Sequence, residues 1–185
     1  SVSETLISAA AAKPGELALD IGCGGGVTSA AIAATTGAEG QVLGVDISEI
    51  ILNIARERYA TVANLSFTTA DAAEHRFEAG RYDLITSRFG VMFFPEPETA
   101  FSNILRAGKR GGRMVFICWR TLAENPWMGA PAAAAFTVLE PPEKPTPGPF
   151  SLADADRVQQ IMGVAGFVDI SLSPIDTLLN LGELE

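Results

Sequence analysis

The chain has 185 residues, of which 48% are hydrophobic and 19% are charged. Roughly 150 residues make a typical domain, so the length predicts one domain with a core that needs no disulfide or metal to hold it. Asp and Glu outnumber Lys and Arg by 22 to 13, which gives a formal charge of −9. A chain of this charge repels a phosphate backbone, and the composition therefore argues against a nucleic-acid partner.

The cysteines and the apolar runs exclude several other classes. Cys23 and Cys118 form no closely spaced pair and no cluster with histidine, so neither a metal site nor a disulfide framework is expected. No apolar run approaches the roughly 18 residues of a membrane helix, and Ser1 to Glu4 do not resemble the basic start of a signal peptide. We expect a cytoplasmic protein with reduced thiols and no integral membrane contact. The chain starts without Met, so its native ends stay open.

Short apolar runs alternate with helical segments over the first two-thirds of the chain. Strands are expected over residues 17–21, 41–45, 65–69, 82–86 and 113–119, and helices over 27–35, from Ser48 onward, and over 99–107. In the helix after Ser48, residues at helical spacing predict the apolar face: Ile50, Ile51, Ile54 and Ala55. Because parallel strands need crossover helices, this alternation predicts an α/β fold, a doubly wound and mostly parallel sheet with helices on both faces.

The pattern stops between residues 125 and 149, where most of the 11 prolines lie. We interpret this stretch as a lid or substrate insertion, with few hydrogen-bonded elements of its own, rather than as a second domain. After it, Ser151 is expected to cap a helix that runs to Ala165, with Gly166 as its stop. Residues 168–172 alternate like a sixth strand.

The segment over residues 20–26 follows the first strand and reads DIGCGGG before a helix begins. Gly22, Gly24 and Gly26 permit a tight turn and bring the backbone close to a ligand at the helix N-terminus. A dinucleotide fingerprint has a small residue where this chain has Val27, and a carboxylate at Asp20 repels a pyrophosphate. Asp20 instead suits a cationic ammonium group, directly or through water.

Two further acidic residues follow the second and third strands. Asp46 ends the second strand, where a carboxylate can accept hydrogen bonds from both ribose hydroxyls, which implies a nucleoside. Asp71 follows the third strand, where it could accept a hydrogen bond from the exocyclic amine of adenine. Each Asp alone has an ordinary alternative, since an Asp after a strand is often a turn former or a helix cap. Together with Asp20, they direct three acids into one crevice.

These residues resemble the motifs of the class I S-adenosylmethionine-dependent methyltransferases, in particular the branch similar to ubiquinone and menaquinone C-methyltransferases. The resemblance covers residues 14–119 and extends weakly to 173, with motifs at 18–26, 44–48, 71–72, 82–90 and 105–115. The chain departs from the family in reading KRGG at 109–112, where KPGG is usual. It also ends where the family has an antiparallel seventh strand, so residues 177–181 either supply a short version or the C-terminal part is truncated.

The resemblance implies S-adenosylmethionine as the cofactor and S-adenosylhomocysteine as the product. It assigns the glycine loop to the methionine moiety, Asp46 to the ribose and Asp71 to the adenine amine, with Ile47 and Ala72 on either side of the adenine. The complete expected cofactor site is Asp20, Gly22, Cys23, Gly24, Asp46, Ile47, Asp71, Ala72 and Ser87.

Methyl transfer from an activated sulfonium needs positioning and desolvation rather than a catalytic triad. Two residues are weak candidates for a catalytic role: His75, as a general base or a solvated loop residue, and Arg88, as the partner of an anionic acceptor or of nearby carboxylates. Aromatic residues are more often ordinary core, but those near the ends of the fourth and fifth strands also suit a substrate wall. The expected substrate-binding residues are Arg88, Phe89, Met92, Trp119, Asn125 and Trp127.

Residues 87–90 read SRFG and lack the tetrapeptide that marks enzymes acting on nucleic-acid bases or protein amides. We therefore expect a small-molecule methyl acceptor, apolar or aromatic. Two alternatives stay open. An NAD(P)-dependent oxidoreductase shares the sheet and the loop, although Val27, Asp20 and the absence of a Tyr-x-x-x-Lys pair count against it. The second alternative is a non-catalytic module that senses S-adenosylmethionine or uses the fold as a scaffold for a homodimer, and only an activity assay separates it from an enzyme.

Overall fold

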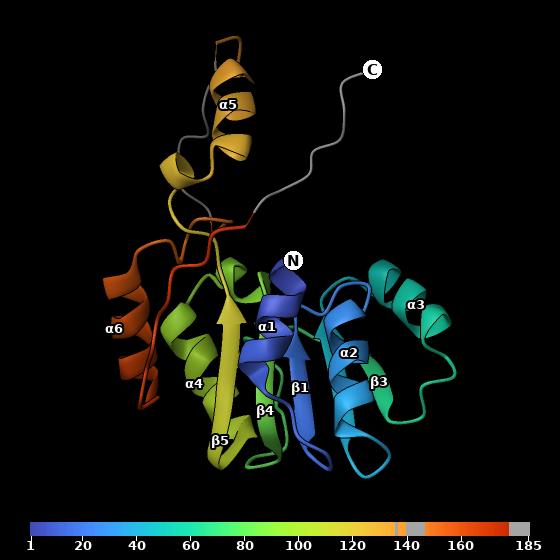
Figure 1. Ribbon diagram of the computed structural model, residues 1–185. Coiled ribbons are helices and arrows are strands. Elements are labelled where there is room, and N and C mark those ends of the chain that lie inside the picture. The colour runs from blue at the N-terminus through green and yellow to red at the C-terminus, as the bar shows by residue number, and fades with distance from the viewer. Residues whose placement is uncertain (136, 140–146, 178–185) are drawn as a thin grey trace.

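The computed structural model describes residues 1–135, 137–139 and 147–177, and a five-stranded sheet lies at its centre (Figure 1). All neighbouring strands are parallel, and their order across the sheet is β3-β2-β1-β4-β5. This confirms the doubly wound fold, and the order reverses between β1 and β4, where such folds bind ligands at the carboxyl ends of the strands. The strands are β1 (Leu17–Ile21), β2 (Gln41–Asp46), β3 (Leu65–Thr69), β4 (Tyr82–Arg88) and β5 (Gly108–Ile117).

Helices cover both faces of the sheet. Helices α1 and α2 pack on the face to which Ala18 points, whereas α4 and α6 pack on the face to which the neighbouring Leu19 points. Consecutive side chains of a strand point to opposite faces, so β1 is buried on both sides. The helices are α1 (Val2–Ala10), α2 (Val27–Thr36), α3 (Glu49–Arg58), α4 (Pro97–Ala107), α5 (Pro126–Ala135) and α6 (Ala155–Ala165), with short 3-10 helices η1 (Gly90–Phe93) and η2 (Leu122–Glu124). None of the described helices is long and apolar enough to cross a membrane.

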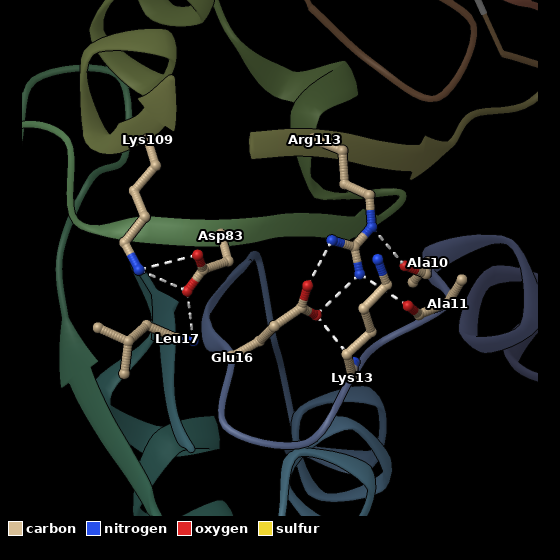
Figure 2. A network of polar contacts seen from close by, with 8 residues as sticks. All are labelled: Ala10, Ala11, Lys13, Glu16, Leu17, Asp83, Lys109 and Arg113. Atoms are coloured by element: carbon tan, nitrogen blue, oxygen red, sulfur yellow. Dashed lines mark hydrogen bonds and ion pairs between the residues drawn. The ribbon is translucent and has the colours of Figure 1, made fainter. Parts of the chain in front are cut away.

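Figure 2 shows how α1, which is not among the predicted elements, is fastened to the sheet. Arg113 on β5 donates from Nε to the carbonyl oxygen of Ala10 and from Nη2 to that of Ala11, each at 2.8 Å. The same guanidinium contacts both carboxylate oxygens of Glu16 at 2.8 Å. These contacts satisfy carbonyls at the end of α1, and the hydrogen bonds from Arg113 lower the pKa of Glu16. The network lies at the amino end of β1, away from the ligand-binding edge.

Helix α3 differs from its predicted packing. Ser48 caps it as expected, and Ala55 is buried together with Leu52. The rest of the predicted apolar face is wrong, because Ile50 and Ile54 are 78% and 51% exposed. Helix α3 packs against β3 at the outer end of the sheet, so only a narrow stripe of it meets the core.

Two predicted boundaries also shift. Strand β5 begins at Gly108 rather than at residue 113, because the KRGG segment stays beside β4 through an irregular register in which Tyr82 pairs with Gly108 and Leu84 with Arg113. The strand ends at Ile117 rather than at residue 119. A glycine-rich polar segment resembles a turn in sequence, and only the neighbouring strand shows that it belongs to the edge.

Helix α6 begins three residues later than predicted, because its cap is Asp154 rather than Ser151. Asp154 caps it by accepting a hydrogen bond from the backbone N–H of Arg157 at 3.0 Å, whereas Ser151 donates its hydroxyl to the carbonyl oxygen of Met92. Gly166 ends the helix as predicted, with a φ of 102°.

The sixth strand predicted over residues 168–172 is not formed. Residues 167–177 have no regular structure, and together with β5 and α6 they line a groove of about 1400 Å³. A strand needs a backbone partner, and within the described residues β5 pairs only with β4. Val168 is therefore 81% exposed although its neighbour Phe167 packs against the core. The short last strand expected over 177–181 lies outside the described residues, apart from Thr177, which is not in a strand.

The proline-rich insertion contains more regular structure than predicted. Its first part forms α5, with Pro131 inside the helix. Figure 1 shows that α5 stands beyond the carboxyl ends of the strands, on the same side as the switch point. Residues 136 and 140–146 of the insertion lie outside the described part, and its role as a lid stays a prediction.

Candidate cofactor and acceptor site

The loop after β1 is shaped by glycines. Gly22, Gly24 and Gly26 have φ angles of 64°, 52° and 78°, in the left-handed region that other residues adopt only at a cost. The N–H of Cys23 donates to the carbonyl oxygen of Val45 at 3.0 Å, which fastens the loop to the end of β2. The backbone itself therefore requires the alternating glycines that the sequence shows.

Two of these glycines are packed and one is open. A Cβ at Gly22 would lie 2.7 Å from the Cα of Gly90, and a Cβ at Gly26 would lie 2.6 Å from a neighbouring aromatic ring. At Gly24 the nearest atom would be the Cγ2 of Ile51, 4.0 Å away. A ligand can thus approach the backbone at Gly24, while Gly22 and Gly26 hold the loop in position.

Gly90 is a site residue to which sequence reasoning gave no role. A Cβ on Gly90 would lie 2.8 Å from both the Cα of Gly22 and the carbonyl oxygen of Ile21. The chain after β1 and the chain after β4 therefore touch backbone to backbone. A glycine two residues after the end of β4 was the available signal, but the contact depends on pairing of β1 with β4, which are far apart in sequence.

Asp20 lies beneath the loop and is 1% exposed. Its carboxylate accepts hydrogen bonds from Ser29 Oγ at 2.6 Å and from Thr86 Oγ1 at 2.9 Å. Burial raises the pKa of Asp20 to about 6, against the effect of the two hydroxyls. Both carboxylate oxygens are occupied inside the protein, so Asp20 supports the loop from below, and its contact with an ammonium group stays a prediction. Ser29 and Thr86 were not predicted, because α2 and β4 bring them to Asp20 only in the folded chain.

Asp46 ends β2 and faces the same loop. Its Oδ2 accepts a hydrogen bond from the N–H of Gly24 and its Oδ1 accepts one from the N–H of Ser48, each at 2.9 Å. The carboxylate thus performs the ordinary task of a turn former and also holds the cofactor loop. Each oxygen has a second lone pair, the side chain is only half-buried, and its hydrogen bonds with a ribose stay a prediction.

The residues expected to surround the adenine follow β2 and β3. Ile47 presents a side chain that is 73% exposed, whereas Ala72 is buried. Asp71 is exposed after β3, and its Oδ1 accepts the N–H of Ala73 at 2.9 Å, which is the turn-forming role. Ile47 and Asp71 both remain open to a ligand, and their contacts with adenine stay predictions.

Ser87 and Cys23 are buried and support the loop with their side chains. Ser87 Oγ donates to the carbonyl oxygen of Ile21 at 2.8 Å and accepts the N–H of Val91 at 3.3 Å. Burial raises the pKa of the Cys23 thiol, which disfavours the reactive thiolate. Contacts of Cys23 and Ser87 with the cofactor stay predictions.

An aromatic cluster of Phe89, Trp119 and Trp127 follows β4 and β5. Phe89 stacks on Trp119 with ring centroids 4.3 Å apart and an angle of 9° between the planes. Trp127, on α5, meets Trp119 edge to face at 5.5 Å. Phe89 has a φ of 69°, which is unusual for a bulky residue. The three rings line the groove beside β5.

The other expected acceptor residues have different positions. Met92 is buried, and its sulfur accepts the N–H of Trp119 at 3.4 Å, so it supports the aromatic cluster from behind. Asn125 donates from Nδ2 to the carbonyl oxygens of Arg120 and Thr121 at 3.1 and 2.9 Å. Arg88 donates to the hydroxyl of Ser3 on α1 at 2.9 Å.

His75 does not belong to this site. Together with Leu17 and Gln41, the first residues of β1 and β2, it lines a separate cavity of about 250 Å³. The amino ends of these strands lie at the edge opposite the glycine loop. The connection from β3 to β4 has to return there because the strands are parallel. The exposed side chain of His75 at this edge favours the solvated loop residue over the general base. Within the described residues, no three His, Cys, Asp or Glu side chains are grouped so as to hold a metal ion.

Comparison with known families places the chain in a class. Residues 18–112 match the family model described as a methyltransferase domain, which is just over half of the chain. The chain therefore belongs to this family, and its glycine loop and sheet order are those of the class I S-adenosylmethionine-dependent methyltransferases.

The chain is also similar to individual methyltransferases. Demethylmenaquinone methyltransferase of Staphylococcus aureus (strain MRSA252) is 34% identical over 103 residues, which cover 56% of this chain and 43% of that protein. The chain thus matches less than half of the length of this relative. Among solved structures, phosphoethanolamine N-methyltransferase 2 of Haemonchus contortus in complex with S-adenosyl-L-methionine is 25% identical with a TM-score of 0.68, covering 90% of this chain and 36% of that one. A methyltransferase from Aquifex aeolicus shares the fold, at 20% identity and a TM-score of 0.67, over 89% of this chain and 78% of that one.

Proposed function

We propose that the chain transfers a methyl group from S-adenosylmethionine to a small apolar or aromatic molecule. The open backbone at Gly24 beside the Asp46 carboxylate is the observation that carries this proposal. It combines close approach to the backbone with an acceptor for hydroxyl groups. Such a combination suits a nucleoside that carries an amino-acid side chain better than it suits a pyrophosphate.

The residues at the switch point fit this cofactor. Asp46 would accept hydrogen bonds from the ribose, Gly24 would face the methionine moiety, and Ile47 and Asp71 would meet the adenine. Bound S-adenosylmethionine supplies a methyl group that is already activated on a sulfonium. The protein's own contribution is then to orient the acceptor and exclude water. With His75 at the opposite edge of the sheet, no histidine serves as a general base in this proposal.

The acceptor would lie on the side of β4 and β5. The aromatic cluster of Phe89, Trp119 and Trp127 offers flat apolar surface there. The similarity to a protein named for demethylmenaquinone supports a quinone-like aromatic acceptor. A small-molecule acceptor is also consistent with the SRFG sequence after β4.

Isothermal titration calorimetry tests the cofactor. S-adenosylmethionine and S-adenosylhomocysteine should bind with dissociation constants on the order of micromolar, equivalent to roughly 8 kcal/mol. NAD and NADP should bind far more weakly, because Val27 stands where a dinucleotide fingerprint has a small residue and Asp20 puts a carboxylate beneath the loop that would hold a pyrophosphate. Equal or tighter binding of NAD would contradict the proposal and favour an oxidoreductase.

A mass-spectrometric assay separates an enzyme from a module that only binds. The protein with S-adenosylmethionine is offered phenols, quinols and a lipid-like control, and a gain of one methyl group is measured. Cofactor binding without methyl transfer to any acceptor would leave a binding module as the better description.

A further inference from the structure

The indole nitrogen of Trp127 makes no hydrogen bond with the described part of the chain. This Nε1 atom is buried, and within the described residues no other buried side-chain nitrogen or oxygen is without a partner. Buried N–H groups are nearly always satisfied in proteins, because an unmet donor loses its hydration without compensation. An acceptor atom from outside the chain would remove this penalty.

The surroundings of Trp127 are those of a binding wall. Its ring meets Trp119 edge to face, and Trp119 stacks on Phe89. All three residues line the same groove, which is large enough for a ligand of several rings. Planar aromatic molecules pack well on such surfaces, since aromatic pairs add attraction to the burial of apolar area.

The position of Trp127 is fixed by its neighbours rather than by its N–H. The side chain of Asn125 donates to the carbonyl oxygens of Arg120 and Thr121. The carbonyl oxygen of Asn125 accepts the N–H groups of Met128 and Gly129. The start of α5 is therefore held by a turn with satisfied hydrogen bonds. Replacing the indole by another ring should remove the donor and leave this turn intact.

The backbone of Phe89 fixes the position of the aromatic cluster relative to the cofactor loop. It adopts a φ of 69° directly before Gly90, which touches the backbone of Gly22. A bulky residue rarely adopts the left-handed region, and such strain is retained where the surroundings enforce it. Here it places the phenyl ring on Trp119, one residue from the contact with the loop.

We propose that the Trp127 indole N–H donates a hydrogen bond to an oxygen of the methyl acceptor, and so selects an aromatic acceptor that carries a hydroxyl or carbonyl group. An indole N–H is a donor only, so it discriminates between an acceptor oxygen and a bare ring edge. The aromatic faces recognise the ring, and the indole recognises its substituent. This inference rests on the proposed function, since it concerns the acceptor half of the same site.

NMR spectroscopy of the isotope-labelled chain tests the inference directly. The chain has two tryptophans, so its indole N–H region contains two signals, which Trp127→Phe and Trp119→Phe assign by elimination. The probes are a naphthol and naphthalene, added to protein saturated with S-adenosylhomocysteine. The naphthol should shift the Trp127 indole signal downfield, as expected for a new hydrogen bond, and naphthalene should not.

Affinity provides the second measurement. Trp127→Phe should weaken naphthol binding about fivefold to tenfold, the effect of one hydrogen bond. It should leave naphthalene binding and S-adenosylhomocysteine binding unchanged. If Trp127→Phe does not fold, the assignment from Trp119→Phe and the spectrum of the unaltered chain still decide the question.

The possible outcomes separate the two proposals. An unmoved Trp127 signal when the naphthol binds, equal loss of both probes in Trp127→Phe, or binding of neither probe would overturn the role of Trp127. Each of these results leaves cofactor binding intact. Failure of the chain to bind S-adenosylhomocysteine at all would instead overturn the proposed function.

Discussion

The cofactor side and the acceptor side of the switch point are built in different ways. Around the glycine loop, the polar groups are paired inside the protein: Asp20 with two hydroxyls, Asp46 with two backbone N–H groups, and Ser87 with the loop carbonyl of Ile21. Around Trp119 and Trp127, the surfaces are apolar, and a buried donor has no partner among the described residues.

This contrast indicates which part of the site is rigid in the absence of a ligand. A loop held by backbone contacts and satisfied hydrogen bonds keeps one geometry with or without a ligand. In the aromatic cluster, the Trp127 indole N–H has no partner within the described residues, so it can form a hydrogen bond only when a ligand supplies an acceptor. The comparison predicts that substitutions on the cofactor side change stability and cofactor affinity together, whereas those on the acceptor side change affinity alone.

The largest effect is expected from Gly90→Ala. Its Cβ would meet the backbone of Gly22 and Ile21 at 2.8 Å, and backbone atoms cannot move away as a flexible side chain can. Overpacking of this kind costs about 3 kcal/mol of unfolding free energy, and the displaced loop should also lose S-adenosylhomocysteine affinity. Denaturant unfolding and calorimetry on the same variant measure both quantities.

Gly163→Ala is the matched control. Gly163 lies inside α6, and a Cβ there would have no atom within 4 Å. Alanine is the better helix former, so this variant should gain about 1 kcal/mol and keep its cofactor affinity. Similar destabilisation in both variants would mean that the contact between Gly22 and Gly90 has no special importance.

Asp46→Ala should have the next largest effect. Loss of charge-assisted hydrogen bonds to the ribose should lower S-adenosylhomocysteine affinity on the order of a hundredfold. Because the carboxylate also accepts the N–H groups of Gly24 and Ser48, unfolding free energy should fall by about 1–2 kcal/mol.

Asp83→Ala controls for the loss of a strand-bound carboxylate. Asp83 accepts the N–H of Leu17 at 2.9 Å and pairs with Lys109 at 2.8 Å, at the opposite edge of the sheet (Figure 2). It should lose comparable stability and retain cofactor affinity. If Asp46→Ala also kept its affinity, Asp46 would be only a turn former, and the cofactor assignment would lose its main support.

The smallest effect is expected from Asp20→Asn and depends on pH. The pKa of Asp20 in the folded protein, about 6, lies above the ordinary value of 3.8, so the folded state binds the proton more tightly. The stability from this group is present in full below pH 3.8 and is lost as the pH rises through 6. Relative to Asp20→Asn, the unaltered chain should lose about 2 kcal/mol of unfolding free energy between pH 4.5 and 6.5.

This pH series also tests the position of Asp20. Other carboxylates, such as Glu16, are common to both proteins and cancel in the difference. A difference that stays flat with pH would show that Asp20 is solvated rather than buried. A large loss of cofactor affinity in Asp20→Asn, without loss of stability, would instead favour direct contact with an ammonium group.

The parts of the molecule that sequence reasoning predicted well are those determined by local pattern. Strands β1 to β4 are short apolar runs beside glycines or acids, and the loop after β1 needs its glycines for their own φ angles. Asp46 was identified correctly at the end of β2 because a polar residue after a buried strand marks the sheet edge. Its second task, holding the N–H of Gly24, depends on contact between two loops.

The parts that could not be predicted depend on partners distant in sequence. Residues 168–172 alternate like a strand, but they lack a neighbouring backbone within the described residues. The exposed Ile50 has the spacing of a core residue, and only the position of α3 at the end of the sheet explains its exposure. His75 seemed available for catalysis until the return of the chain to β4 placed it at the opposite edge.

The contact of Gly22 with Gly90 sets a limit on how this site can diversify during evolution. It joins the cofactor loop to the residue after Phe89 without any side chain that selection could enlarge, shrink or recharge. The distance between the loop and the first ring of the wall is therefore fixed as long as both positions remain glycine. Under the proposed function, changes in acceptor preference would arise farther along the chain, at Trp119, Trp127 and the rest of α5, which do not take part in this backbone contact.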